Sequence, residues 1–284
     1  MRYLLGVTIL WAFSFSLIGV YLAGQVDAYF AVLSRIALAL LIFLPLLYRY
    51  RGTATDAFTL AALGAVQLGL MYIFYYQSFL LLSVPQVLVF TIFTPIYITL
   101  LYDALSGRFN LRFLVAALLA VLAAAVMRDG IPAPDYWLGF AVVQGANLCF
   151  AAGQVGYKKF MEPKSNQLAQ HQQFGWFYVG ALAVALPAWW LLGSSNYPQH
   201  ASQWLVLLWL GLVASGGGYF WWNKGASQVS SGTLAVMNNA LIPAGLLVNL
   251  LIWNRDADLL RLGAGVTILV FSLWLCRHAL LQEK

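Results

Sequence analysis

Charged residues are scarce along this chain, and their scarcity limits the class of protein it can be. Only 8% of the residues are charged and 62% are hydrophobic, with a mean hydropathy of +0.81, whereas soluble domains carry about 25% charged residues. These values exclude a soluble globular protein and predict a polytopic protein of the lipid bilayer. The net charge of +6 does not indicate a nucleic-acid partner, because the basic residues lie between apolar runs and form no stripe.

Acidic residues and histidines are missing from the interiors of the apolar runs. All nine acidic residues and all three histidines lie at the ends of these runs or between them. Proton-coupled pumps usually carry an ionisable relay inside the membrane, so this absence argues against coupling through a buried carboxylate. The chain also has no H-E-x-x-H motif and no paired aspartates within a run. We therefore expect no enzymatic activity, no metal site and no cofactor.

Cysteine is nearly absent as well. The two cysteines, Cys149 and Cys276, lie in different apolar runs about half a chain apart. This spacing implies no disulfide framework. We interpret both as small apolar packing residues.

What the sequence has in abundance is apolar runs long enough to cross a membrane, which takes about 20 residues in a helix. Ten such runs are predicted, at residues 3–23, 29–48, 58–80, 86–105, 112–127, 137–157, 173–192, 203–223, 233–253 and 260–278. Short connections join most of them. The sequence therefore predicts an all-α integral membrane protein with ten transmembrane helices.

One stretch of the sequence is repeated. The pattern of residues 64–95 returns at residues 211–243, so that Tyr72 falls on Tyr219 and Pro95 falls on Pro243. An internal repeat at this interval divides the chain into two five-helix halves, 1–130 and 131–284, with a seam near Gly130 to Pro134. An odd number of spans per half makes the second half enter the membrane from the opposite side, which predicts an inverted repeat.

The basic residues predict the orientation in the membrane. With a cytoplasmic N-terminus, eleven Lys and Arg residues fall on the cytoplasmic side and three on the other, leaving out Arg35, which lies within a span. Cytoplasmic loops carry an excess of positive charge in most membrane proteins. We therefore expect both termini in the cytoplasm.

Arg35 is the one charged residue inside a predicted span. A charge in this position is a functional-site hypothesis by default, and a guanidinium can receive a substrate carboxylate through two parallel hydrogen bonds. The alternative is that the side chain extends toward the membrane surface or binds neighbouring carbonyls. The sequence leaves both interpretations open.

Polar stripes in two spans mark further candidates. Gln144 and Asn147 share one face of the sixth span with Gln154, and Trp11 and Ser14 occupy the repeat-related place in the first span. An amide facing lipid would be costly, so these residues must face protein or water. They either line a cavity or join helices by hydrogen bonds.

Aromatic residues in the repeated stretch suggest the walls of a cavity. Tyr72 and Tyr76 in the third span, and Tyr219 and Trp222 in the eighth, combine an apolar ring with a polar group. Asn238 precedes a proline in the ninth span, and its amide exceeds what the proline-broken backbone requires. Packing and anchoring at the membrane surface are the alternative roles for the aromatic residues.

Several of these features resemble the drug/metabolite transporter superfamily, in particular its EamA-type exporters. The resemblance rests on the Trp-Ala-Phe-Ser-Phe-Ser run at 11–16, on Ser-Arg-Ile-Ala-Leu-Ala at 34–39, and on the prolines Pro95 and Pro243. Many relatives carry a glutamate where this chain has Arg108 and Asp256, so no role of that glutamate carries over. The resemblance implies a central cavity and the export of small metabolites.

Together these features predict a bacterial inner-membrane transporter that exports a small organic solute by alternating access, as a monomer or homodimer. Amino acids or related amines and carboxylates are the leading substrate class. A passive channel or a non-transporting scaffold protein is the alternative. The predicted substrate-binding residues are Trp11, Ser14, Arg35, Tyr72, Tyr76, Gln144, Asn147, Tyr219, Trp222 and Asn238.

Overall fold

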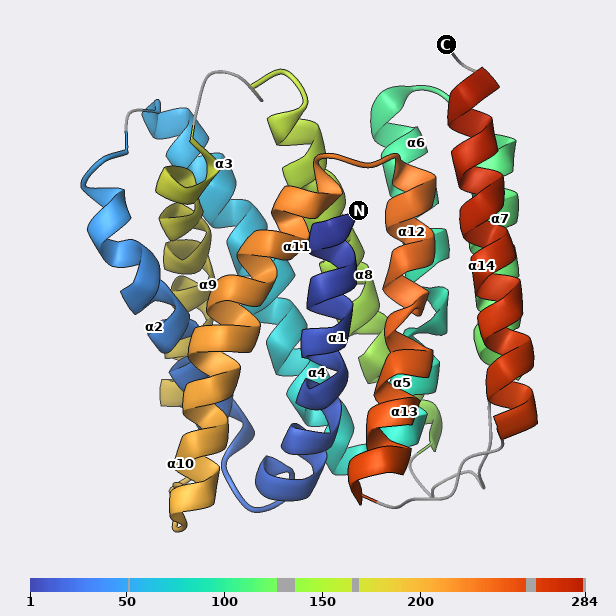
Figure 1. Cartoon of the computed structure of the whole chain (residues 1–284). Helices are drawn as coiled ribbons and strands as arrows, with labels where there is room; N and C mark the ends of the chain where they lie inside the picture. The colour runs from blue at the N-terminus through green and yellow to red at the C-terminus, as the bar shows by residue number, and fades with distance from the viewer. Residues whose placement is uncertain (51, 127–135, 165–168, 254–258, 283–284) are drawn as a thin grey trace.

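The chain folds into a bundle of helices (Figure 1). The structure is a computed structural model, and it describes residues 1–50, 52–126, 136–164, 169–253 and 259–282. The predicted seam at Gly130 to Pro134 lies outside these residues. In chain order the helical elements are α1 (Arg2–Leu17), η1 (Ile18–Leu22), α2 (Ala28–Leu47), α3 (Ala54–Gly64), η2 (Ala65–Leu70), α4 (Met71–Leu81), α5 (Val84–Phe90), η3 (Thr91–Phe93), α6 (Thr94–Ser106), α7 (Leu111–Val126), α8 (Tyr136–Met161), α9 (Gln170–Leu192), α10 (Ala201–Leu208), η4 (Trp209–Gly217), α11 (Gly218–Ala226), α12 (Ser231–Asn239), α13 (Leu241–Trp253) and α14 (Leu259–Gln282).

Several of these elements join end to end into membrane-length helices. Within the described residues, eight helices are long and apolar enough to cross a bilayer, and shorter apolar stretches lie at 111–123 in α7 and 263–275 in α14. Each of the ten predicted runs coincides with a helix to within four residues. The prediction of an all-helical, multi-pass membrane protein is therefore confirmed.

The distribution of polar and apolar side chains is the reverse of that in a soluble protein. Large apolar residues such as Ile9, Leu251 and Trp190 are exposed on the outside of the bundle, whereas Gln154 and Asn223 are fully buried within it. Lipid tails solvate the outer apolar side chains, and only protein or trapped water can satisfy the inner amides. The polar groups of the chain therefore gather along the bundle axis.

Two helices are distorted at places that the internal repeat relates to each other. The helix from Ala54 to Leu81 contains the π-helical segment η2, and the helix from Ala201 to Ala226 contains the π-helical segment η4. The next helix in each half is interrupted, at η3 in the first half and at Ala240 in the second. π-helical turns and prolines free backbone carbonyls from the usual ladder. Such carbonyls need other donors when they are buried.

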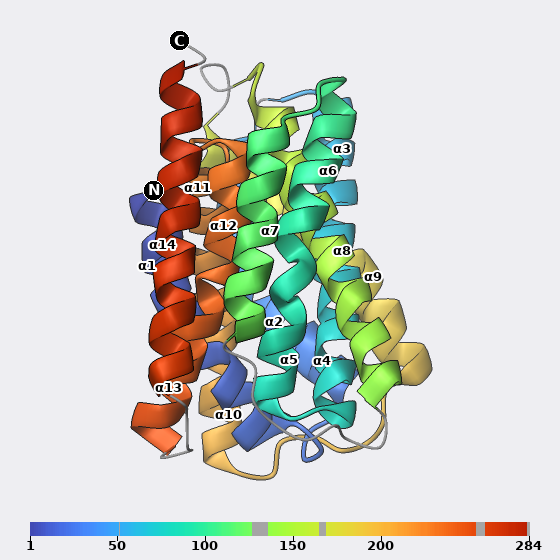
Figure 2. The same cartoon turned by 90° about the vertical axis from the view of Figure 1, so that its right-hand side faces the viewer.

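Helix packing also recurs between the halves. α9 packs against α3 and η2, and α2 packs in the corresponding way against η4; α4 packs against α8, and α11 packs against α1. α2 and α9 contact each other directly. α7 and α14 form a pair at one side of the bundle in both views (Figures 1 and 2). The remaining helices surround the centre, where the candidate site lies.

Candidate functional site

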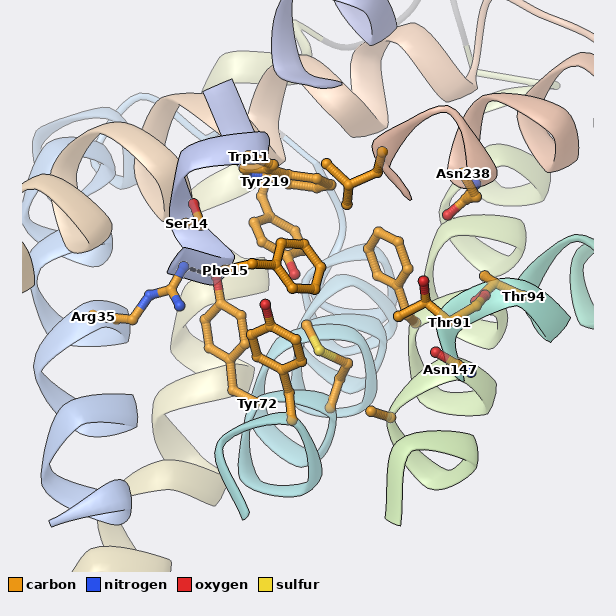
Figure 3. A pocket seen from close by; sticks show the side chains of 15 residues that line it. Trp11, Ser14, Phe15, Arg35, Tyr72, Thr91, Thr94, Asn147, Tyr219 and Asn238 are labelled. Carbon is orange, nitrogen blue, oxygen red and sulfur yellow. Dashed lines mark hydrogen bonds between the residues drawn. The ribbon is translucent and has the colours of Figure 1, made fainter. Parts of the chain in front are cut away.

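A cavity lies inside the bundle between helices of both halves (Figure 3). About 630 Å³ within it is not filled by atoms, including the part open to the outside. Its polar lining residues are Ser14, Arg35, Thr91, Thr94, Asn147 and Asn238. Its other lining residues are Trp11, Phe15, Met71, Tyr72, Tyr75, Ala146, Phe150, Tyr219 and Leu241. Mostly apolar walls with a few polar groups are typical of small-molecule sites.

Arg35 lies at one end of this cavity, with only 2% of its surface exposed. Its Nε donates to Ser215 Oγ at 3.0 Å, its Nη1 to the Tyr76 hydroxyl at 3.2 Å, and its Nη2 to the Tyr72 hydroxyl at 2.8 Å. The guanidinium also lies over the Tyr72 ring, 4.2 Å from its centroid. Arg35 therefore points inward among neutral partners and does not extend to the membrane surface.

The π-helical segment η4 supplies the backbone around this end. Trp11 Nε1 donates to the Ala214 carbonyl at 2.8 Å, and the Tyr178 hydroxyl donates to the carbonyls of Ser215 and Gly216 at 2.6 and 3.1 Å. A π-helical turn leaves such carbonyls without their α-helical donors. The distortion therefore joins α1 and α9 to η4 and fixes Ser215 beside Arg35.

Asn147 and Gln144 meet at the other end of the cavity. Both amides donate to the Phe90 carbonyl, at 2.8 Å from Asn147 and 3.0 Å from Gln144, and Asn147 also donates to Gln144 Oε1 at 3.1 Å. Tyr97 donates to the same Gln144 oxygen at 3.1 Å. Phe90 precedes the interruption η3, where the helix loses regular hydrogen bonding. The polar stripe of α8 thus binds the broken helix and also faces the cavity.

Asn238 and Trp222 belong to a second amide network. Gln154 accepts from Trp222 Nε1 at 2.9 Å and exchanges hydrogen bonds of 3.3 Å with the Asn238 amide. Asn238 also donates to the Leu234 carbonyl at 2.8 Å. Trp222 is 1% exposed and does not line the cavity. Its role in the structure is to hold α11 against α8.

The two threonines near Pro95 complete the polar end. The Thr94 hydroxyl donates to the Thr91 carbonyl at 2.7 Å. Pro95 has no N–H to give this carbonyl, which accepts from the backbone N–H of Thr94 as well. Thr91 donates to the Leu88 carbonyl at 2.7 Å. Both hydroxyls line the cavity, although the proline explains only the hydrogen bond from Thr94.

Seven of the ten predicted site residues line the cavity: Trp11, Ser14, Arg35, Tyr72, Asn147, Tyr219 and Asn238. The other three, Tyr76, Gln144 and Trp222, lie behind them and hydrogen-bond to them or to their neighbours. The prediction missed Ser215, whose place inside a run of small residues is the only sequence signal. It also missed Phe15 and Phe150, which nothing in the sequence separates from other apolar residues.

Acidic side chains lie away from the cavity. The four that the structure describes are at or near helix ends: Asp27, Asp56, Asp103 and Glu162. The other five, Asp129, Asp135, Asp256, Asp258 and Glu283, lie outside the described residues. Over the described ranges, no group of three or more His, Cys, Asp or Glu side chains could hold a metal ion.

A multi-pass helical bundle with a polar and aromatic cavity at its centre defines a membrane transport protein. Known proteins agree with this class. The chain is 55% identical over 280 residues to a probable biotin transporter of Pseudomonas aeruginosa, covering 98% of this chain and 97% of the relative. It is 49% identical over 281 residues to the biotin transporters of Salmonella typhimurium and Escherichia coli K12, covering 98% of this chain and 93% of each. The chain belongs to the same family of bacterial membrane transporters as these proteins.

Structure comparison shows the same fold elsewhere. A solved crystal structure of another protein superimposes with a TM-score of 0.77 at 17% identity, covering 100% of this chain and 98% of that one. No protein-family model matches the chain. The relatives are named as transporters and not as enzymes, which supports a multi-pass transporter of the bacterial inner membrane. Their names specify biotin, and the predicted amino-acid substrate class has no counterpart in them.

Proposed function

We propose that this protein carries biotin across the bacterial inner membrane. The observation that carries the proposal is the identity of 49–55% to proteins named as biotin transporters over almost the full length of the chain. Biotin joins a carboxylate and a ureido ring through an apolar ring and chain. The cavity has polar groups at two ends and aromatic walls between them, which suits a solute of this kind. Biotin therefore replaces amino acids as the leading substrate.

The proposed architecture is ten transmembrane helices in two inverted five-helix halves, divided near residue 130. The repeat-related distortions η2 and η4, and the helix contacts that recur between halves, support it. α7 and α14 run alongside the longer helices, which supports their being the fifth and tenth spans (Figures 1 and 2). Membership of the drug/metabolite transporter superfamily, with both termini in the cytoplasm, is part of the same proposal. A monomeric or homodimeric state remains a prediction.

The proposed mechanism is alternating access without a carboxylate relay inside the membrane. The described acidic residues lie at helix ends, away from the cavity, so none of these four carboxylates is placed to load a proton beside the substrate. A site between two related halves is accessible to each side in turn when one half rocks against the other. The direction of net transport, which the resemblance predicts to be export, remains a prediction.

Counterflow in proteoliposomes tests this function. Vesicles loaded with unlabelled biotin should accumulate labelled biotin transiently, with the proton gradient collapsed, because a carrier exchanges one molecule for another. A passive channel or a scaffold protein would give no such accumulation. An excess of mixed amino acids should not reduce the counterflow of labelled biotin. If amino acids reduced it and unlabelled biotin did not, the substrate would belong to the amino-acid class that the sequence predicted.

A matched pair of variants places transport in the cavity. Asn147→Ala removes an amide at the cavity, whereas Leu148→Ala shortens the next side chain of α8, which is 50% exposed on the outside of the bundle. We expect the first to reduce counterflow at least about tenfold, because truncation removes a polar group that lines the cavity and one of the two donors to the Phe90 carbonyl, and the second to change it by less than about twofold. Equal losses of transport and of membrane-inserted protein in the Asn147 variant would assign that amide to helix packing alone.

A further inference from the structure

Arg35 is a buried cation without a counter-charge. Its three hydrogen-bond partners, Ser215, Tyr72 and Tyr76, are neutral groups. Across the described residues no carboxylate forms an ion pair with it, and the salt bridges present there involve lysines 158, 159 and 164. A charge within a membrane span is costly unless something pairs with it. The structure therefore leaves one positive charge at the cavity wall for an anion to neutralise.

The guanidinium also retains hydrogen-bonding capacity. Arginine has five N–H donors, and the three bonds to Ser215, Tyr76 and Tyr72 use one each on Nε, Nη1 and Nη2. One N–H on each terminal nitrogen remains, at the side chain of a cavity-lining residue. Two such donors match the two oxygens of a carboxylate. The tyrosines and Ser215 hold the guanidinium in place for that contact.

The far end of the cavity has the opposite hydrogen-bonding character. Thr91 and Thr94 line the cavity and donate their hydroxyl protons to backbone carbonyls, so their hydroxyl oxygens keep lone pairs to accept hydrogen bonds. Asn147 uses its amide nitrogen on Phe90 and Gln144, and among the described residues no donor reaches its Oδ1. This end therefore offers acceptor oxygens to the N–H groups of a solute.

Figure 3 shows the two ends on opposite sides of the cavity. Arg35 and Tyr72 lie on one side, and Thr91, Thr94 and Asn147 lie on the other, with Phe15 between them. The cavity thus has a cationic end, an apolar middle and an acceptor end. A solute with a carboxylate at one end and N–H donors at the other fits in one orientation.

We propose that Arg35 is the carboxylate-binding, specificity-determining residue of the cavity, and that Thr91 and Asn147 receive the N–H donors at the opposite end of the solute. For biotin this places the carboxylate at Arg35 and the ureido ring near α8 and η3, and the assignment rests on the proposed function. In the reverse orientation the carboxylate would meet the oxygens of Thr91, Thr94 and Asn147, whose donor hydrogens are already bonded to protein groups.

Competition binding to the purified full chain tests the orientation. The probes are tritiated biotin and its alcohol, biotinol, in which a hydroxymethyl group replaces the carboxylate. In the wild type we expect biotinol to compete about 10- to 100-fold more weakly than biotin, the usual range for a hydrogen-bonded charge. Arg35→Gln should weaken biotin by a similar factor and change biotinol by less than about threefold, so that the preference disappears.

Thr91→Val is the matched variant at the other end. It keeps the shape of the side chain and removes the acceptor, and both probes carry the same ureido ring. We therefore expect it to weaken biotin and biotinol by the same factor, about 3- to 10-fold. A variant that weakened biotin alone would reverse the proposed orientation.

The outcomes separate this inference from the function on which it rests. If the wild type binds biotin and biotinol equally, Arg35 does not bind the carboxylate, although biotin remains the substrate. If Arg35→Gln lowers both affinities equally, Arg35 acts only in packing. If the wild type binds neither probe, the proposed function itself is wrong. If the glutamine variant does not fold, the wild-type comparison of the two probes decides alone.

Discussion

The two repeat-related helices at the cavity share a backbone distortion and differ in the hydrogen bonds that their aromatic side chains make. The helix from Ala54 to Leu81 and the helix from Ala201 to Ala226 each contain a π-helical segment followed by aromatic residues. In the first, the Tyr72 and Tyr76 hydroxyls accept N–H groups of Arg35, and the Tyr72 hydroxyl also shares a hydrogen bond of 2.8 Å with Ser215 Oγ. In the second, Tyr219 lines the wall while Trp222 donates to a buried amide. The backbone distortion is thus common to both helices, whereas two of the three hydroxyls that bind Arg35 come from the first helix and the third, that of Ser215, comes from the second.

The two helices also differ in how closely they approach their packing partners, α9 and α2. A Cβ atom at Gly64 would overlap the backbone carbonyl of Phe177 in α9, whereas a Cβ at the repeat-related Gly211 would meet the Cβ and Cδ1 atoms of Leu38 in α2, both at 2.7 Å. Small residues allow helices in membranes to approach closely. The first contact is with the backbone of α9, and the second is with a side chain whose Cδ1 can rotate away but whose Cβ is fixed to α2.

The largest predicted effect is a loss of stability when alanine replaces the glycine at each of these two contacts. Gly64→Ala should destabilise the folded bundle by at least about 3 kcal/mol, because the α9 backbone must shift, and Gly211→Ala by less, about 2 kcal/mol, because Leu38 Cδ1 can rotate away and only its Cβ requires a small shift of α2. Unfolding in detergent mixtures titrated with SDS measures both. Similar losses at the two glycines would show that the close approach at α9 is no tighter than its counterpart at α2.

A smaller effect, on the KM for biotin, is expected to distinguish the repeat-related Tyr72 and Tyr219. Tyr72 accepts from Arg35 and lies 2.8 Å from Ser215 Oγ, so Tyr72→Phe should raise the KM for biotin counterflow about tenfold, as expected for a hydrogen bond to a charged group. Tyr219→Phe keeps the aromatic wall and should raise it less than about threefold. If the two variants behave alike, the tyrosine hydroxyls do not position the guanidinium.

The positions of the helices were more predictable than their faces. Apolar length alone located each run to within four residues of a helix, because lipid requires such lengths of any spanning helix. No proline in the sequence marks the π-helical segments. Each segment rotates the residues that follow it relative to an uninterrupted helix. Tyr72 and Tyr219, which come directly after these segments, line the cavity, whereas Tyr76 and Trp222, about one turn further on, lie behind its wall. In the uninterrupted α8 the predicted face holds at Asn147, but Gln144, one turn earlier, also lies behind the wall.

What periodicity cannot supply is the partner across the cavity. The interval between Arg35 and Ser215 in the sequence is 180 residues, and no local pattern links an arginine in one half to a serine in the other. The sequence singled out Arg35 as a charge and left its role open. Only the packing of α2 against η4 and α4 shows that its partners are neutral hydroxyls.

The smallest expected effect concerns the connections between helices, where the halves also differ. Asp27, before α2, accepts hydrogen bonds from the backbone and hydroxyl of Ser194. Glu162, after α8, accepts from the Tyr102 hydroxyl at 2.6 Å and pairs with Lys159 at 3.2 Å. The first contact is with backbone in a neighbouring loop, and the second is with long, partly exposed side chains. The second should therefore contribute less to stability.

Glu162→Gln tests that contribution through its pH dependence. Burial raises the pKa of the Glu162 carboxyl. The hydrogen bond from Tyr102 and the nearby charges of Lys159 and Lys158 lower it, and together they outweigh burial, so the pKa lies below its ordinary value. A depressed pKa stabilises the fold above the unfolded-state value near 4.5, and this stabilisation is lost as the pH falls through the folded-state value. Solvent screens a carboxyl this exposed, so the substitution should cost less than about 1 kcal/mol at pH 7 and nothing once both states are protonated. SDS titrations of the variant and the wild type at several pH values measure the difference, and a loss that grew toward low pH would contradict the assignment.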